Sequence, residues 1–211
     1  MWPPEAIEFL TELEANNDRD WFRANRDRYN AQLLEPARRL SEKLGDLGQP
    51  YFFRPWNNTR FRPGPPLKEH IAFTVGDGPA VYYAQLSLDG LLVGAGLHHP
   101  ARDQLERFRA GVDDGREGAA LERAIIRAAE GALVAIEPEL KRAPKGYSPG
   151  HPRIERLRMK QLTIFDRHEL GHWLHTGGCA KRVRKQFDAA TPFVQWINKH
   201  VGPSTEPTAR S

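Results

Sequence analysis

The chain has 211 residues, of which 39% are hydrophobic and 27% charged, and its formal net charge is +4. This balance is typical of a mildly basic globular protein and excludes a disordered chain. No apolar run approaches the ~20 residues that a membrane-spanning helix needs, and the first residues lack the pattern of a secretory signal. A single cysteine, Cys179, excludes an internal disulfide and fits a reducing compartment. We therefore expect a cytoplasmic protein without a membrane partner.

The N-terminal part of the chain is predicted to be helical. Ile7, Leu10 and Leu13 repeat at helical spacing behind two prolines that suit a first turn, which predicts a short helix to about residue 15. Asn17 or Asp18 can cap a second helix that continues to about residue 29, because a short oxygen-bearing side chain accepts bonds from free first-turn amides. A clean apolar stripe follows over 33–47. Pro36 interrupts this stripe and predicts a kink or a restart.

The middle of the chain reads as strands, which we place at 51–54, 71–75, 81–88 and 91–97. Asp89-Gly90 between the last two runs is a strong hairpin signal. Consecutive strand-like runs joined by short connections favour an antiparallel sheet.

The C-terminal half is predicted to return to helices, with two short strands between them. We expect helices at 100–112, 118–130, 153–158 and 183–201, and strands at 133–136 and 161–165. Thr191-Pro192 predicts a restart inside the last helix, as a cap followed by a first-turn proline. The sequence therefore predicts one α+β domain over 1–201, an antiparallel sheet covered by helices, and a frayed tail over 202–211.

One stretch, 54–73, is unlike ordinary core. It reads RPWNNTRFRPGPPLKEHIAF, with four basic side chains, two asparagines, one tryptophan and four prolines. A segment this polar and this stiff is typical of the wall of a site. A second basic stretch, 140–160, holds seven Lys or Arg and one acid, hence +6, which leaves −2 for the rest of the chain. Such a patch can attract an anion, nucleic acid or an acidic partner, or it can be a solvated face.

A zinc-site motif occurs near the end of the chain. His168-Glu169-Leu170-Gly171-His172 matches H-E-x-x-H, which binds zinc when both histidines share a helix face and the glutamate acts as general base. The run before it reads as a strand, however, and glycines follow soon after. We therefore predict no metal or other cofactor, and keep His168 and His172 as weak candidates.

Four stretches together resemble the bacterial and fungal family called domain of unknown function 2461. They are the run 16–22 with Asn25, Arg26 and Tyr29; Arg60-Phe61 with Lys68, His70, Ile71 and Ala72; Tyr82-Tyr83 through to Pro100; and 140–147 with His151-Pro152. The resemblance covers about 9–201 and implies no established activity. The resemblance also weakens the support for a zinc site, since the family pattern does not include H-E-x-x-H at this place. The run 62–68 departs from the family pattern, which carries two further lysines, an aspartate and a tyrosine.

Our leading hypothesis is a cationic cleft, formed by the sheet and the 54–73 loop, that binds an anionic ligand such as nucleic acid. Arginine holds carboxylates and phosphates through a planar fork, lysine adds a point charge, and tryptophan can stack on a ring. The predicted binding residues are Trp56, Arg60, Arg62, Lys68, His70 and Lys145. The alternatives are a zinc-dependent hydrolase and a structural or partner-binding protein whose arginines pair with Asp18, Asp20 and Asp27. The sequence leaves the ligand, any reaction and the oligomeric state open.

Overall fold

Six strands form one sheet in the part of the chain that the computed structural model describes, residues 1–59 and 63–206. The strand order is β1-β2-β3-β4-β6-β5, and the pairings of β1 with β2 and of β5 with β6 are antiparallel. The bounds are β1 Pro50–Phe52, β2 His70–Val75, β3 Val81–Ser87, β4 Gly90–Leu97, β5 Val134–Ala135 and β6 Leu162–His168. The predicted antiparallel sheet is confirmed, and β6 continues three residues beyond its predicted end.

Side chains of β3 show why this sheet has one covered face. Tyr82, Ala84 and Leu86 are buried, whereas Tyr83 and Gln85 between them are only half-buried. Because successive side chains of a strand point to opposite faces, this alternation marks one face as packed on the core and the other as open.

The chain divides into two compact units. Unit 1 comprises Met1–Gly76, Tyr83–Val93 and Arg167–Arg184, and unit 2 comprises Asp77–Tyr82, Gly94–Asp166 and Lys185–Ser211. Strands β3, β4 and β6 contribute residues to both. The units are described separately below.

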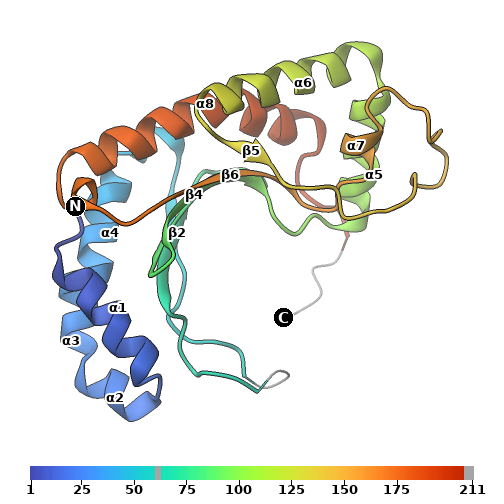
Figure 1. Ribbon diagram of the computed structural model, residues 1–211. Coiled ribbons are helices and arrows are strands. Elements are labelled where there is room, and N and C mark those ends of the chain that lie inside the picture. Colours follow the sequence, from blue (N-terminus) through green and yellow to red (C-terminus); the bar gives the residue numbers. More distant parts are fainter. Residues whose placement is uncertain (60–62, 207–211) are drawn as a thin grey trace. The chain divides into compact units, whose positions relative to one another are not determined.

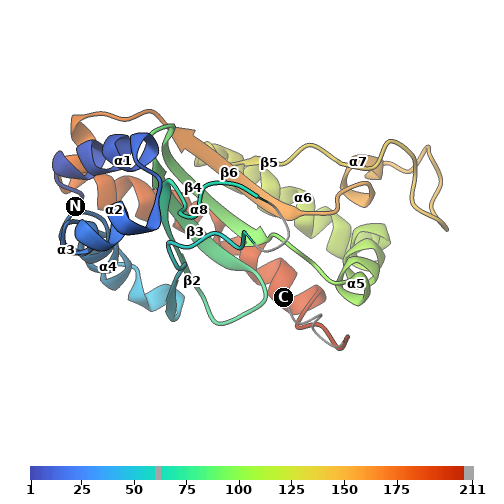
Figure 2. The same cartoon turned by 90° about the horizontal axis from the view of Figure 1, so that it is seen from below.

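Unit 1 places a helical layer on β2. Its helical elements are α1 Glu5–Ala15, α2 Arg19–Ala24, α3 Arg26–Tyr29, the π-helical η1 Asn30–Leu34, α4 Glu35–Glu42 and the 3-10 turn η2 Gly45–Leu47. In Figure 1 and in the turned view of Figure 2 these helices lie on one side of β2, against which α4 packs. Phe9, Leu33, Leu40 and Phe73 are fully buried in this core. Pro36 stands in the first turn of α4, where the π-helical η1 gives way to an α-helix without a gap, so the predicted restart takes the form of a change in helix type.

Unit 2 is built mainly from helices. They are α5 Arg102–Asp113, α6 Gly115–Glu130 and α7 Ile154–Leu157. Asp114 caps α6 by accepting from the backbone amides of Arg116 and Glu117, each at 2.8 Å. Phe108 of α5 meets Trp196 edge to face with ring centroids 5.9 Å apart. These contacts join α5 to the last helix.

The last helix, α8, is continuous over Gly178–His200 with Pro192 inside it. The predicted restart at this proline is therefore wrong. A proline within a helix costs roughly 3 kcal/mol, but Phe187, Phe193 and Ile197 on both sides of it are buried. We attribute the continuity of the helix to this shared apolar face.

The segment after α8 is held by Asp103 of α5. Its carboxylate accepts from the Ser204 hydroxyl and from the Thr205 backbone amide, both at 2.8 Å. The predicted frayed tail comprises residues 202–211. Its last five residues, 207–211, lie outside the described part of the chain.

The fold is α+β with helices packed on an antiparallel sheet, as predicted. Within the described ranges, no helix is both long enough and apolar enough to span a membrane.

Candidate functional site

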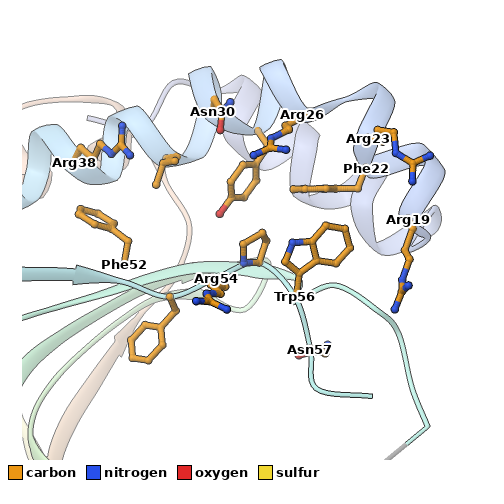
Figure 3. Close-up of a pocket in the computed structure, with 14 residues that line it drawn as sticks. Arg19, Phe22, Arg23, Arg26, Asn30, Arg38, Phe52, Arg54, Trp56 and Asn57 are labelled. Carbon is orange, nitrogen blue, oxygen red and sulfur yellow. The ribbon is translucent and has the colours of Figure 1, made fainter. Parts of the chain in front are cut away.

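Five arginines of unit 1 lie along a groove of about 750 Å³. One wall is helical and comes from 19–38, and the other is the chain from the end of β1 to Asn57 (Figure 3). Its lining includes the arginines Arg19, Arg23, Arg26, Arg38 and Arg54. It also includes the aromatic residues Phe22, Tyr29, Phe52, Phe53 and Trp56. The groove thus combines cationic and aromatic side chains.

The helical wall is organised by a cap and by residue spacing. Asp18 caps α2 by accepting from the backbone amides of Asp20 and Trp21, each at 2.8 Å. Arg19 and Arg23 lie four positions apart in α2, which brings their side chains to one face of that helix. Arg26 begins α3, directly after the non-helical Asn25. Phe22 of the same helix is buried and anchors the wall.

The opposite wall carries Arg54 and Trp56. Trp56 is 43% exposed, and its ring meets Phe22 edge to face with centroids 5.3 Å apart. In Figure 3 its indole projects from the loop toward the helical wall. The tryptophan therefore has one packed edge and a surface left open to the groove.

Charge around the groove is unbalanced. No carboxylate is among the described residues that line it. Arg23 pairs with Asp20 at 2.8 Å and Arg38 with Glu35 at 2.6 Å. Both pairs are exposed, and exposed ion pairs contribute little to the free energy of folding. Within the described ranges, the guanidinium groups of Arg19, Arg26 and Arg54 have neither an ion pair nor a hydrogen bond. These three groups are free to bind an anion.

Tyr29 adds a hydroxyl to the groove. The residue is only 5% exposed, and burial raises the pKa of its phenol to about 12. Its ring packs on Phe9 and Phe22, yet in the described part of the chain its hydroxyl has no hydrogen-bond partner. The hydroxyl is not among the buried polar atoms that lack a partner, and Tyr29 lines the groove, so this neutral donor is suited to a ligand there.

The loop that carries Trp56 is fixed by two asparagines. Asn57 donates from its side chain to the carbonyl oxygen of Leu67 at 2.9 Å. Asn17 donates to the same oxygen at 3.1 Å and accepts from the Leu67 amide at 3.0 Å. Trp56 and Leu67 also form an isolated β-bridge. Asn17, predicted as a possible helix cap, instead joins the helical wall to the loop.

Replacing Asn17 by alanine is expected to lower the free energy of unfolding by about 2 kcal/mol, because the buried Leu67 then loses its Asn17 partner at both amide and carbonyl. Urea denaturation measures this change. Asn16→Ala is the matched control, since Asn16 makes one exposed bond to the Glu12 carbonyl. Equal losses in the two variants would contradict the role given to Asn17.

Of the residues predicted from the sequence, Trp56 lines the groove, whereas Lys68 and His70 do not. Lys68 donates from Nζ to the Arg54 carbonyl at 2.9 Å and lies 5.6 Å from the Phe53 ring centroid. Burial lowers the pKa of its ammonium group. Arg60 and Arg62 lie outside the described residues. Lys145 is exposed in a loop of unit 2 and is not among the lining residues.

His70 stands at the start of β2 and is half-buried. Burial, and after it the charge of Lys68, lowers the pKa of its imidazole below its ordinary value. The unfolded chain therefore binds a proton at a higher pH than the folded protein, so stability falls as pH drops through the window below about 6.5.

His70→Gln is expected to flatten the pH dependence of the free energy of unfolding in the range below about pH 6.5. The neutral amide cannot be charged, so this variant loses the part of the slope that comes from His70. Urea midpoints across this range measure the effect. A slope identical to that of the wild-type protein would contradict the shifted pKa.

The H-E-x-x-H motif is not helical. His168 ends β6, Gly171 is extended, and His172 begins the 3-10 turn η3, His172–His175. The two histidines therefore do not share a helix face, which the zinc motif requires. Among the described residues, no group of three or more His, Cys, Asp or Glu is placed to share a metal ion.

Three arginines of the basic stretch 140–160 in unit 2 are tied into the fold. Arg153 donates to the backbone carbonyls of Val112 and Asp114 at 2.6 and 2.9 Å. Arg156 pairs with Glu122 at 3.1 Å, and Arg158 with the neighbouring Glu155. Three of the seven basic side chains of this stretch are thus held by the fold, whereas Lys141, Arg142, Lys145 and Lys160 are exposed.

Comparison with protein families gives one match. Residues 5–196 match the family described as a conserved hypothetical protein, DUF2461. The chain belongs to the DUF2461 family. The resemblance seen in the sequence is thereby confirmed over nearly the whole chain. No curated protein and no solved structure matches this DUF2461 protein.

Several lining residues of this DUF2461 member were not among the predicted binding residues. Arg19 and Arg26 were noted only as part of the family pattern, and Arg54 only as the start of the 54–73 stretch. Their spacing on a helix was visible in the sequence. The approach of the chain after β1 to this helical wall was not visible in the sequence, because contact between distant segments depends on tertiary packing.

Proposed function

We propose that this DUF2461 protein binds an anionic ligand in the groove of unit 1. The observation that carries the proposal is the set of three arginines, Arg19, Arg26 and Arg54, that surround one groove without a carboxylate partner among the described residues. Unpaired cations repel each other and gain free energy when an anion neutralises them. The proposal moves the predicted cationic cleft from Lys68 and His70 to the arginines that line this groove.

The chemistry of the lining indicates what kind of anion fits. A guanidinium group binds phosphate or carboxylate through two parallel hydrogen bonds. Phe22 and Trp56 supply apolar ring surface beside these cations. A ligand that carries phosphate or carboxylate together with a flat ring would use both. Such a mixture of a few polar groups and an aromatic surface is typical of small-molecule and nucleotide sites.

The two alternative functions receive less support. For a structural protein, the arginines were expected to pair with Asp18, Asp20 and Asp27; Arg23 does pair with Asp20, but Asp18 caps α2. Arg19 and Arg26 have no such pair in the described part of the chain. For a zinc hydrolase, the required helix is absent at 168–172. A cytoplasmic location stays a prediction.

Calorimetric titration with tripolyphosphate at low ionic strength tests the proposal. We expect saturable binding that weakens as salt rises, because exposed arginines are screened within about 10 Å at 0.1 M salt. Arg142→Gln is the control, since Arg142 is exposed in unit 2 and does not line the groove. Binding that is lost in this control but retained in Arg54→Gln would refute the proposed site.

Tyr29→Phe separates ligand binding from folding. The change removes only a hydroxyl that has no partner in the described part of the chain, so the free energy of unfolding is expected to stay within about 0.5 kcal/mol of the wild-type value. If the hydroxyl donates to the ligand, tripolyphosphate affinity falls by roughly 2- to 10-fold. Urea denaturation and titration of the same sample measure both. A loss of stability without any loss of affinity would mean that the hydroxyl is structural.

A further inference from the structure

The arginines extend along the length of the groove. Helical structure runs without a gap from Arg26, the first residue of α3, through η1 to Glu42 at the end of α4. Arg26 and Arg38 both line the groove and are twelve positions apart. At about 1.5 Å of rise per residue, this separation is about 18 Å along the wall. A ligand with one compact anionic group cannot contact both ends.

The aromatic side chain at the groove is suited to an unpaired base. Trp56 is 43% exposed and meets Phe22 edge to face, so the edge packing leaves ring surface open to the groove. Bases stack on such rings largely without regard to sequence. In a duplex each base is already stacked between its neighbours, and taking it out costs free energy. An exposed tryptophan beside a row of cations therefore favours a single strand over a duplex.

We propose that the groove binds single-stranded nucleic acid, with successive phosphates along the wall from Arg26 to Arg38 and one base on Trp56. This inference rests on the proposed function, because it names the class of the anion bound at the same site. Phosphates of one strand rise about 3.4 Å each when the bases are stacked. A wall of about 18 Å then corresponds to roughly five nucleotides, in the range of known single-strand sites. The exposed pair of Arg38 with Glu35 is weak enough to be exchanged for a phosphate.

Fluorescence anisotropy with labelled oligo(dT) and oligo(U) of increasing length tests the inference. Affinity is expected to rise steeply up to roughly five nucleotides and only slightly beyond, because further residues leave the groove. The slope of log K against log salt should be about −0.7 for each phosphate neutralised, or about −2 to −3.5 for three to five contacts. Arg26→Gln should make that slope shallower by about 0.7, and Arg142→Gln should not change it.

Variants of Trp56 test the stacking contact. Trp56→Leu should weaken oligonucleotide binding by roughly 5- to 150-fold without changing the salt slope, since stacking involves no counterion. Trp56→Phe keeps a ring and should retain most of the affinity. If Trp56 acted in folding alone, both variants would lose stability, and the leucine and phenylalanine variants would not differ in oligonucleotide affinity. Circular dichroism melting of each variant monitors the fold.

The outcomes distinguish this inference from the proposed function. If tripolyphosphate binds in an arginine-dependent way but long oligonucleotides bind no tighter than dinucleotides, the inference is overturned and the anion site stands. If a duplex binds as tightly as the single strand and Trp56→Leu has no effect, the inference is also overturned. If neither probe binds at low salt, both proposals are overturned. Tighter binding of oligo(dT) would indicate a DNA strand and tighter binding of oligo(U) an RNA strand, and either result supports the inference.

Discussion

Replacing Arg19, Arg26 and Arg54 together by glutamine is expected to weaken tripolyphosphate binding by roughly 150-fold at low salt. A hydrogen bond to a charged group contributes about 1.5–3 kcal/mol when well enclosed and exposed pairs contribute less. We assign about 1 kcal/mol to each arginine, because all three are exposed. The sum of about 3 kcal/mol corresponds to the stated factor, since each 1.4 kcal/mol is tenfold. Calorimetric titration measures the change.

Glutamine keeps much of the length and polarity of arginine, so the triple variant should retain the stability of the wild-type protein. Within the described residues, none of the three guanidinium groups makes a hydrogen bond that folding would lose. A second triple variant, with Arg102, Arg116 and Arg142 replaced by glutamine, removes the same charge from unit 2. Equal weakening in both variants would show that binding follows net charge, and the groove would not be the site.

Gly96→Ala is expected to destabilise the protein by about 3–5 kcal/mol. Gly96 lies in β4 with φ +125°, a conformation that favours glycine, and a Cβ there would stand 2.0 Å from the carbonyl oxygen of Leu162 in β6. Backbone strain at such a position costs about 1–3 kcal/mol, and the forced separation of two packed strands costs a similar amount. Urea denaturation at neutral pH measures the loss.

Gly115→Ala is the matched control for Gly96→Ala. Gly115 begins α6, and a Cβ there would meet nothing within 4 Å. Alanine in a compatible helical position is expected to be neutral or to stabilise the protein by about 0.4–1 kcal/mol, because the unfolded chain loses freedom. If Gly96→Ala were as harmless as this control, the close approach of β4 to β6 would be wrong.

Local patterns predicted most of the secondary structure. Alternation in 81–88 and the Asp89-Gly90 turn placed β3 and β4, because period-two patterns and tight turns are set by neighbouring residues. The restart predicted at Pro192 was wrong because tertiary contacts, and not neighbouring residues, decide the structure there. The proline rule is local, but Phe187 and Phe193 bury their rings in contacts that no short window of sequence displays.

The candidate site was predicted less completely than the fold. Trp56 was predicted because a tryptophan in a proline-rich, basic loop is unusual for core. Lys68 belongs to the same loop, but its Nζ bonds the Arg54 carbonyl and it does not line the groove. Arg19 and Arg26 became candidates only when the helical wall was seen opposite β1. Which basic side chains remain unpaired depends on the acidic residues that lie near them in space. Tertiary packing sets these neighbours, so short sequence patterns do not predict them.

Anions are expected to bind between the helical wall and the 54–57 segment. Titration of tripolyphosphate into protein labelled for arginine Nε–Hε resonances tests it most directly, because each side chain reports its own contacts. We expect the resonances of Arg19, Arg26 and Arg54 to shift first and with one common dissociation constant, while the resonance of Arg142 stays unchanged. The largest shift at Arg142, with the three groove arginines unchanged, would contradict it.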